Sequence, residues 1–321
     1  FRRVLFRSSK HLRGDFMQIN LMESLWDNLE KFLKTIDSTY KPKKDSLSLA
    51  VDLGLPADSE NVKENALRRD LSRMLTDYYF YLKRHISVKP RVVRVSEHLR
   101  CPEELNTYYE EFRRKVEVGE NINPYLSKRT LRLSNDDKLL SHWGIYHFHL
   151  GEIWDRNDFS ERSGPVLFVY FCDNTAFFID IREHGSWSDY SLIETVCKEF
   201  PEGMKSRKIE WIRIVEPVIK ESNQIAAMRK VNLNMIVVVD GICYGNIGVM
   251  GDGTDGESLM RSYRILMLIK NIEETIKEQE NKLLEHFKTD ELKVTSDLYN
   301  DSRILKIIIK VNNKELFEVE L

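Results

Sequence analysis

A single change in hydrophobic periodicity constrains the fold of this chain most, because it separates a helical part from a strand-rich part. Before the pair Asn123-Pro124, apolar residues recur three and four positions apart. After it, short aromatic and β-branched runs alternate with breaks rich in Gly, Pro, Asp and Asn. The first pattern indicates amphipathic helices and the second indicates strands. We therefore predict an α+β protein whose N-terminal region, residues 17–122, is helical.

Within that helical region, three helices are expected. The first covers residues 23–37, the second follows a cap at Ser59 and ends near residue 85, and the third runs from 102 to 119. Between the second and third helices, residues 89–95 alternate like a strand.

The next region, residues 123–256, is predicted to be an α+β core built on a mostly antiparallel sheet. The expected strands are 143–150, 166–171, 175–183, 209–215 and 234–240. The second and third of these flank a three-residue break, which suits a hairpin. A helix over 188–200 is expected between the third and fourth strands.

The last region, residues 257–321, is predicted to be a long C-terminal helix followed by a β-hairpin. In the helix, over residues 257–286, Ile residues recur in a seam that resembles a short coiled coil. This seam fits either a helix packed on its own sheet or a homodimer through residues 257–286. The pair Asn312-Asn313 is expected to form the turn of the hairpin.

Charge, hydropathy and cysteine spacing exclude several classes of protein. The formal net charge of -2 disfavours a general nucleic-acid coat protein, and no apolar run is long enough to cross a membrane. The four cysteines lie far apart, so we expect buried free thiols, no thiolate metal cluster and no cofactor. We also see no secretory signal, which makes the reducing cytoplasm the expected location.

The N-terminal residues 2–8, RRVLFRS, resemble the translation of a sequencing-library adapter, as in a reading frame assembled from environmental DNA. Such a segment carries no folding information. Residues 1–16 are therefore expected to be an artefact or disordered, with Met17 or Met22 as the natural start.

The chemistry-bearing signal is the run HWGIYHFHL, residues 142–150, which holds three of the eight histidines. On a strand, side chains alternate between faces, so His147 and His149 share a face with Trp143 and Ile145. By the same rule, Asp180, Arg182 and His184 share a face with Phe178 on the strand 175–183, opposite Phe177, Ile179 and Ile181. If the two polar faces coincide, imidazoles, a carboxylate and a guanidinium meet on one patch.

This set of groups is what metal-free RNA cleavage requires. We expect His147 or His149 to take the proton from the 2′-hydroxyl and His184 to protonate the leaving 5′-oxygen. Arg182 would bind the phosphate, and Asp180 would orient one imidazole.

The border of this site is predicted from a basic segment that precedes the histidine strand. Lys128, Arg129 and Arg132 would contact phosphates, together with Trp143. The alternative is that the segment is a solvated connection.

Two other interpretations of the histidines remain open. They can be half-buried structural residues that form hydrogen bonds, or they can offer two imidazoles to a metal ion that Asp180 or His184 helps to hold. The glycine-rich stretch 245–258 is interpreted as a flexible turn, because its aspartates would repel phosphate and it lacks the lysine of a P-loop.

The order of the strands WGIYHFHL, VLFVYF and TAFFIDIREHG, with Trp143, Tyr170 and His184, resembles the sheet of RelE/ParE-type toxins over about residues 139–186. The resemblance implies a metal-independent RNA-cleaving toxin or defence-type nuclease, with RNA as partner. Two alternatives stay beside it. One is a non-enzymatic regulatory protein that dimerises through its long helix, and the other is a metal-dependent hydrolase that uses the histidines.

Overall fold

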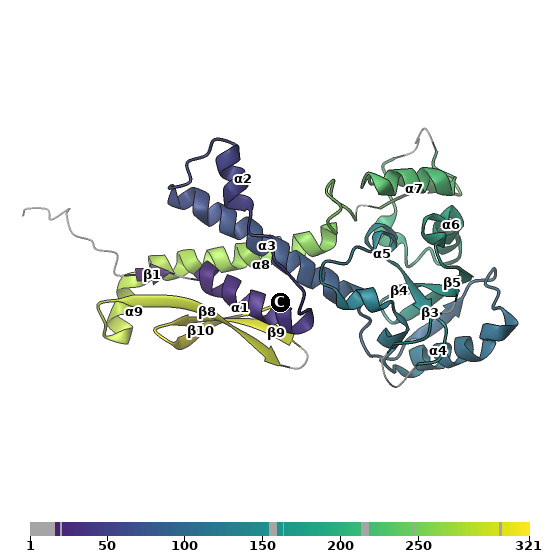
Figure 1. The fold of residues 1–321 in the computed structure, drawn as a ribbon, viewed down its shortest axis with the longest axis horizontal. Coiled ribbons are helices and arrows are strands. Elements are labelled where there is room, and N and C mark those ends of the chain that lie inside the picture. The colour runs from purple at the N-terminus through teal and green to yellow at the C-terminus, as the bar shows by residue number, and fades with distance from the viewer. Residues whose placement is uncertain are drawn as a thin grey trace, which may run out of the picture. The chain divides into compact units, whose positions relative to one another are not determined.

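The computed structural model describes residues 17–19, 21–153, 159–162, 164–212, 218–246, 248–301 and 304–321 (Figure 1). Contacts group the chain into two compact units, one formed by residues 1–75 with 261–321 and the other by residues 76–260. We refer to them as unit 1 and unit 2. The expected regions 17–122, 123–256 and 257–321 follow local composition, whereas these units follow which segments pack together.

Unit 1 combines helices from both ends of the chain with a sheet of strand order β1-β8-β9-β10. Its strands are β1 (Met17–Ile19), β8 (Leu292–Asp301), β9 (Ile304–Val311) and β10 (Lys314–Glu320). The strand β1 pairs in parallel with β8, and the other pairs are antiparallel. Its helices are α1 (Leu21–Ile36), α2 (Ser46–Asp52), α9 (Glu280–Phe287), and parts of α3 (Glu60–Arg84) and α8 (Gly256–Glu278).

Helix α1 is fastened to β8 by side-chain hydrogen bonds as well as by its apolar face. Ser24 and Ser296 place their hydroxyl oxygens 3.0 Å apart, and the Asn28 side chain donates to the Ser296 carbonyl at 2.8 Å. The leucines of α1 are fully buried, as is Ile307 in the neighbouring strand. Segments about 270 residues apart in the chain therefore form one core.

Unit 2 is organised around a sheet of strand order β2-β5-β4-β3. The strands are β2 (Val92–Val95), β3 (Ile145–His149), β4 (Pro165–Cys172) and β5 (Thr175–Glu183). The strand β2 pairs in parallel with β5, while β3-β4 and β4-β5 are antiparallel. The expected mostly antiparallel sheet is thus confirmed, with a tight β4–β5 turn at Asp173-Asn174.

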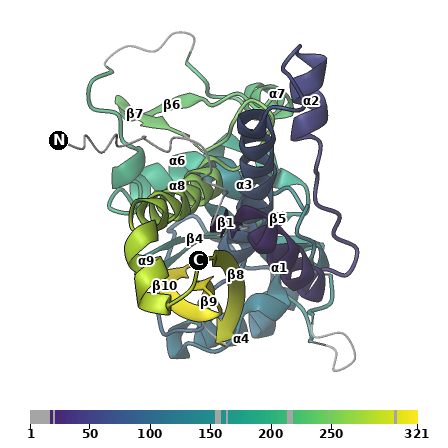
Figure 2. The same cartoon turned by 90° about the vertical axis from the view of Figure 1, so that its left-hand side faces the viewer.

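Two hydrophobic cores cover the faces of this sheet. The α4-side core holds Phe112 of α4 (Asn106–Val118) against Phe148 and Phe178 of the sheet. The α6-side core packs α5 (Lys138–Trp143), α6 (Tyr190–Glu199), α7 (Ser222–Lys230) and the hairpin of β6 (Ile236–Val239) and β7 (Ile242–Gly245) on the other face. Figure 2 shows this hairpin as a separate ribbon beside α6.

Short 3₁₀ turns connect these elements. They are Glu103–Leu105, Asn123–Tyr125, Lys128–Leu131, Ser186–Ser188 and Lys205–Arg207.

Several expected elements are confirmed, and others need correction. The expected helix over 257–286 is two helices, α8 and α9, which meet at Gln279, and β8 was not expected at all. Residues 209–212 belong to no strand, and residues 213–217 lie outside the described part of the chain. Cys101 and Cys172 are half-buried rather than buried, although all four cysteines are free.

The isoleucine seam of α8 is covered within the single chain. Ile269, Ile272 and Ile276 are at most 9% exposed, so other side chains of the same chain cover them. None of the described helices combines the length and the apolar composition needed to span a bilayer.

Candidate active site

A β-bulge in β5 decides which side chains join the histidines of β3. Phe168 pairs with Asp180 but Val169 pairs with Phe178, so Ile179 is an extra residue in β5. The bulge places Ile179 in the α6-side core and Ile181 in the α4-side core, although strict alternation predicts one face for both.

The consequence is that the polar faces of β3 and β5 coincide. His147 is paired through Phe168 with Asp180, and His149 is paired through Val166 with Arg182. Residues directly opposite in neighbouring strands share a face. The expected juxtaposition therefore occurs, but Phe178 lies on the opposite face because of the bulge.

The imidazoles of His147, His149 and His184 lie close together, and two of them contact one tryptophan. The ring of His149 stacks on His184 with 5.6 Å between centroids, and it lies 6.4 Å from His147. Trp187, in the 3₁₀ turn after β5, contacts His147 at 4.3 Å and His184 at 4.8 Å between centroids. His149 is the innermost of the three, with 2% of its surface exposed.

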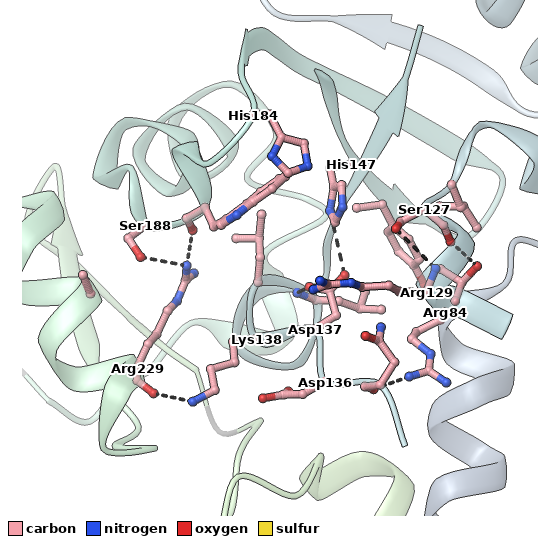
Figure 3. Close-up of a pocket in the computed structure, with 18 of the residues that line it drawn as sticks. Arg84, Ser127, Arg129, Asp136, Asp137, Lys138, His147, His184, Ser188 and Arg229 are labelled. Carbon is pink, nitrogen blue, oxygen red and sulfur yellow. Dashed lines mark hydrogen bonds and ion pairs between the residues drawn. The ribbon is translucent and has the colours of Figure 1, made fainter. Parts of the chain in front are cut away.

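His147 and His184 line a cavity of about 510 Å³, which is a typical size for a small-ligand site. We call it the histidine cavity (Figure 3). Cations outnumber carboxylates in its wall: the cations are Arg84, Arg129, Lys138, Arg162, Arg229 and Lys230, and the carboxylates are Asp136 and Asp137. This composition favours an anionic ligand.

Arg229, at the end of α7, is a buried cation of this wall with two unused donor nitrogens, one more than Arg84 has. It is 4% exposed, and its Nη1 donates to the Trp187 carbonyl. Its Nε and Nη2 atoms have no hydrogen-bond partner among the described residues. Burial lowers its pKa to about 10, and Asp137 partly opposes that shift, so the side chain stays charged at neutral pH.

Asp137 lines the cavity and also lies close to His147. Its carboxylate caps α5 by accepting the backbone N–H of Leu140 at 3.0 Å, and its Oδ2 lies 3.8 Å from Nδ1 of His147. Burial lowers the pKa of His147, the carboxylate of Asp137 opposes this shift, and the nearby His184 adds to it. His147 is therefore neutral at pH 7, the form that accepts a proton.

Arg84 has a different task, because its Nη1 and Nη2 atoms donate to backbone carbonyls, while its Nε has no partner among the described residues. At 1% exposure, it donates to the carbonyls of Arg132 at 2.6 Å and of Asn135. It thereby fixes the loop that carries Asp136 and Asp137 into the cavity. Burial lowers the pKa of Arg84 to about 10, with nearby carboxylates opposing the shift.

The other sequence-predicted residues lie outside the histidine cavity, apart from Arg129 in the 3₁₀ turn of its rim. Arg182 is held by Asp180 at 2.8 Å, by Asp189, and by the Ser191 hydroxyl at 2.6 Å. Asp180 accordingly binds a guanidinium and the backbone of Ile181.

Lys128, Arg132 and Trp143 also lie apart from the cavity lining within the described chain. Trp143 is the last residue of α5 rather than the first of a strand, because Gly144 ends that helix in a left-handed conformation. It is fully buried in the α6-side core, which removes it from contact with a substrate.

The residues that sequence reasoning missed are Asp137, Lys138, Trp187 and Arg229. They come from three separate elements, and in the sequence each resembles an ordinary cap or surface residue. Within the described part of the chain, no group of three His, Cys, Asp or Glu side chains is arranged to hold a metal ion.

Comparison with known proteins adds no further constraint. No family model, curated protein or solved structure matches this chain. The resemblance to the RelE/ParE-type sheet stays a prediction, and the function of the chain has to be inferred from the chemistry of the histidine cavity.

Proposed function

We propose that this chain cleaves RNA without a metal ion, as a toxin or defence-type nuclease, in the histidine cavity. The observation that carries the proposal is the meeting of two accessible imidazoles with a buried guanidinium that has unused N–H donors. Metal-free cleavage of a phosphodiester needs three groups: a base, an acid and a fixed cation.

In the proposed reaction, neutral His147 accepts the proton of the 2′-hydroxyl as its oxygen attacks phosphorus. The bond from phosphorus to the 5′-oxygen breaks, and His184 gives its proton to that oxygen. The products are a 2′,3′-cyclic phosphate and a 5′-hydroxyl. The carboxylate of Asp137, 3.8 Å from Nδ1 of His147, stabilises the protonated form of that imidazole.

The phosphate ligand in this proposal is Arg229 rather than Arg182. Two N–H groups of Arg229 are unpaired within the described chain, whereas Arg182 is neutralised by two carboxylates. Guanidinium binds phosphate through paired N–H donors, and the charged phosphorane strengthens those bonds. Arg129 and Lys138 add positive charge to the same cavity.

Cleavage of a 5′-labelled RNA in EDTA tests the proposal. We expect 2′,3′-cyclic phosphate products, and a loss of roughly 100- to 10,000-fold in rate for His147→Ala or His184→Ala. His98→Ala is the matched control, because His98 belongs to the same unit and its side chain is 76% exposed away from the cavity. Absence of cleavage by the wild-type protein, or equal rates in all three variants, would overturn the proposal.

A second comparison separates the two arginines. Arg229→Lys should lower the cleavage rate more than Arg182→Lys, because two donor nitrogens of Arg229 have no partner among the described residues, whereas Arg182 is held by Asp180 and Asp189. If Arg182→Lys lowers the cleavage rate more than Arg229→Lys, Arg182 is the phosphate ligand instead. Binding of RNA without turnover would instead favour a non-enzymatic regulatory protein.

A further inference from the structure

A second cavity, in unit 1, has a mostly apolar wall and plays no part in the proposed RNA cleavage. It lies among α2, α3 and α8 and has a volume of about 710 Å³. We call it the apolar cavity. Most of its wall is hydrocarbon, including Ala50, Leu55, Val62, Ala66, Leu266 and Met267.

The mouth of the apolar cavity is lined with apolar side chains that remain open to solvent. Leu55 is 48% exposed, Tyr263 49% and Met267 60%. Deeper in, Ala50 and Ala66 are each 5% exposed. Exposed apolar side chains around a cavity are typical of sites that bind an apolar ligand. A flexible Met side chain can adapt to the shape of such a ligand.

The charged residues of this cavity are all cations. Arg68 is neutralised by Glu64 at 2.9 Å and by Glu273 at 2.7 Å. Arg69 is exposed and has no ion pair among the described residues, and Lys270 has one loose contact, 3.8 Å from Glu274. Two cations at the mouth are thus available to a negative group.

We propose that the apolar cavity binds a single-chain anionic amphiphile, such as a fatty acid. Its hydrocarbon chain would lie along Ala50, Ala66 and Leu266, and its carboxylate would pair with Arg69 and Lys270. The volume lies within the range of small-ligand sites, which favours such a molecule over the helix of a partner protein.

Calorimetric titration of the full chain with saturated fatty acids below their micelle concentrations tests the site. Each added methylene should tighten binding about fourfold until the cavity is filled. Dodecyltrimethylammonium, which has the same chain length and the opposite charge, should bind at least tenfold more weakly than dodecanoate. Equal binding of both headgroups, or no binding of either, would overturn the proposal.

Two further measurements fix the location. Arg69→Glu should weaken dodecanoate at least tenfold, whereas Lys63→Glu, on the same helix but paired with Glu60 outside the cavity, should not. The methyl NMR signal of Met267 should shift on binding, and that of Met235, buried in unit 2, should stay. An acidic amphipathic helical peptide that shifts Met267 when dodecanoate does not would contradict the proposal and indicate a protein partner instead.

Discussion

His142, in α5, should make the stability of this protein sensitive to mild acid. Its ring is fully buried, and the Asn246 side-chain amide donates to its Nδ1. Burial, together with the charges of Arg229, Lys138 and Arg207, lowers its pKa from 6.5 to about 4. In the unfolded chain the ring is in water and takes up a proton near pH 6.5.

The sign and size of the effect are set by this difference in pKa. Because the folded-state pKa is lowered, the unfolded chain binds the proton first as the pH falls. The free energy of unfolding is therefore unaffected above pH 6.5 and decreases between pH 6.5 and 4. The loss amounts to about 2 kcal/mol at pH 5 and about 3 kcal/mol at pH 4.

His142→Asn removes the titrating ring but keeps an acceptor for Asn246. Urea unfolding, followed by tryptophan fluorescence at pH 7, 6, 5 and 4, should show the wild type losing about 3 kcal/mol relative to this variant. A pH-independent offset from the smaller side chain is expected as well. If the two unfolding free energies run parallel from pH 7 to 4, His142 does not hold a depressed pKa and the reasoning fails.

Two further predictions concern the backbone and the proposed base. Gly119→Ala should lower the free energy of unfolding by about 3 kcal/mol or more in urea or thermal unfolding, because a Cβ there would lie 2.4 Å from the Pro90 nitrogen. Gly54→Ala, at the same φ of +80° but in open space, should lower it by about 1 kcal/mol. Equal losses in the two variants would refute the clash. Asp137→Asn keeps the α5 cap but removes the charge that raises the His147 pKa, so the acidic limb of the RNA-cleavage pH profile should move down by about one pH unit; a fixed limb would exclude His147 as the base.

The sequence predicted the parts of the fold that depend on local patterns. The α+β class, helices α1, α3 and α4, the three strands β3, β4 and β5, and the final hairpin follow from periodicity, caps and turn residues. The hairpin turn is an example, because Asn312 and Asn313 both have positive φ, as Asn tolerates. The strand β8 was missed because its polar composition does not alternate strongly.

For the candidate site as well, the sequence predicted only the residues that carry a local pattern. His147 and His184 carry a signal in their own strands, but the bulge at Ile179 has none, and it decides which face Asp180 and Arg182 occupy. Arg229 reaches the cavity from a helix more than 40 residues further along the chain. Only tertiary packing brings such a residue to a site, so local spacing cannot reveal it.

Because α1 packs on β8, unit 1 cannot complete its fold until the C-terminal strands have been synthesised. A ribosome adds about 5–20 residues each second, so Ser296 emerges roughly 15–50 s after Ser24, to which it is hydrogen-bonded. Residues 76–260 can collapse during that interval, while the leucine face of α1 still lacks the strand that buries it. A translation stop before residue 292 would leave that face uncovered and would expose the nascent N-terminal helix to chaperones and proteases.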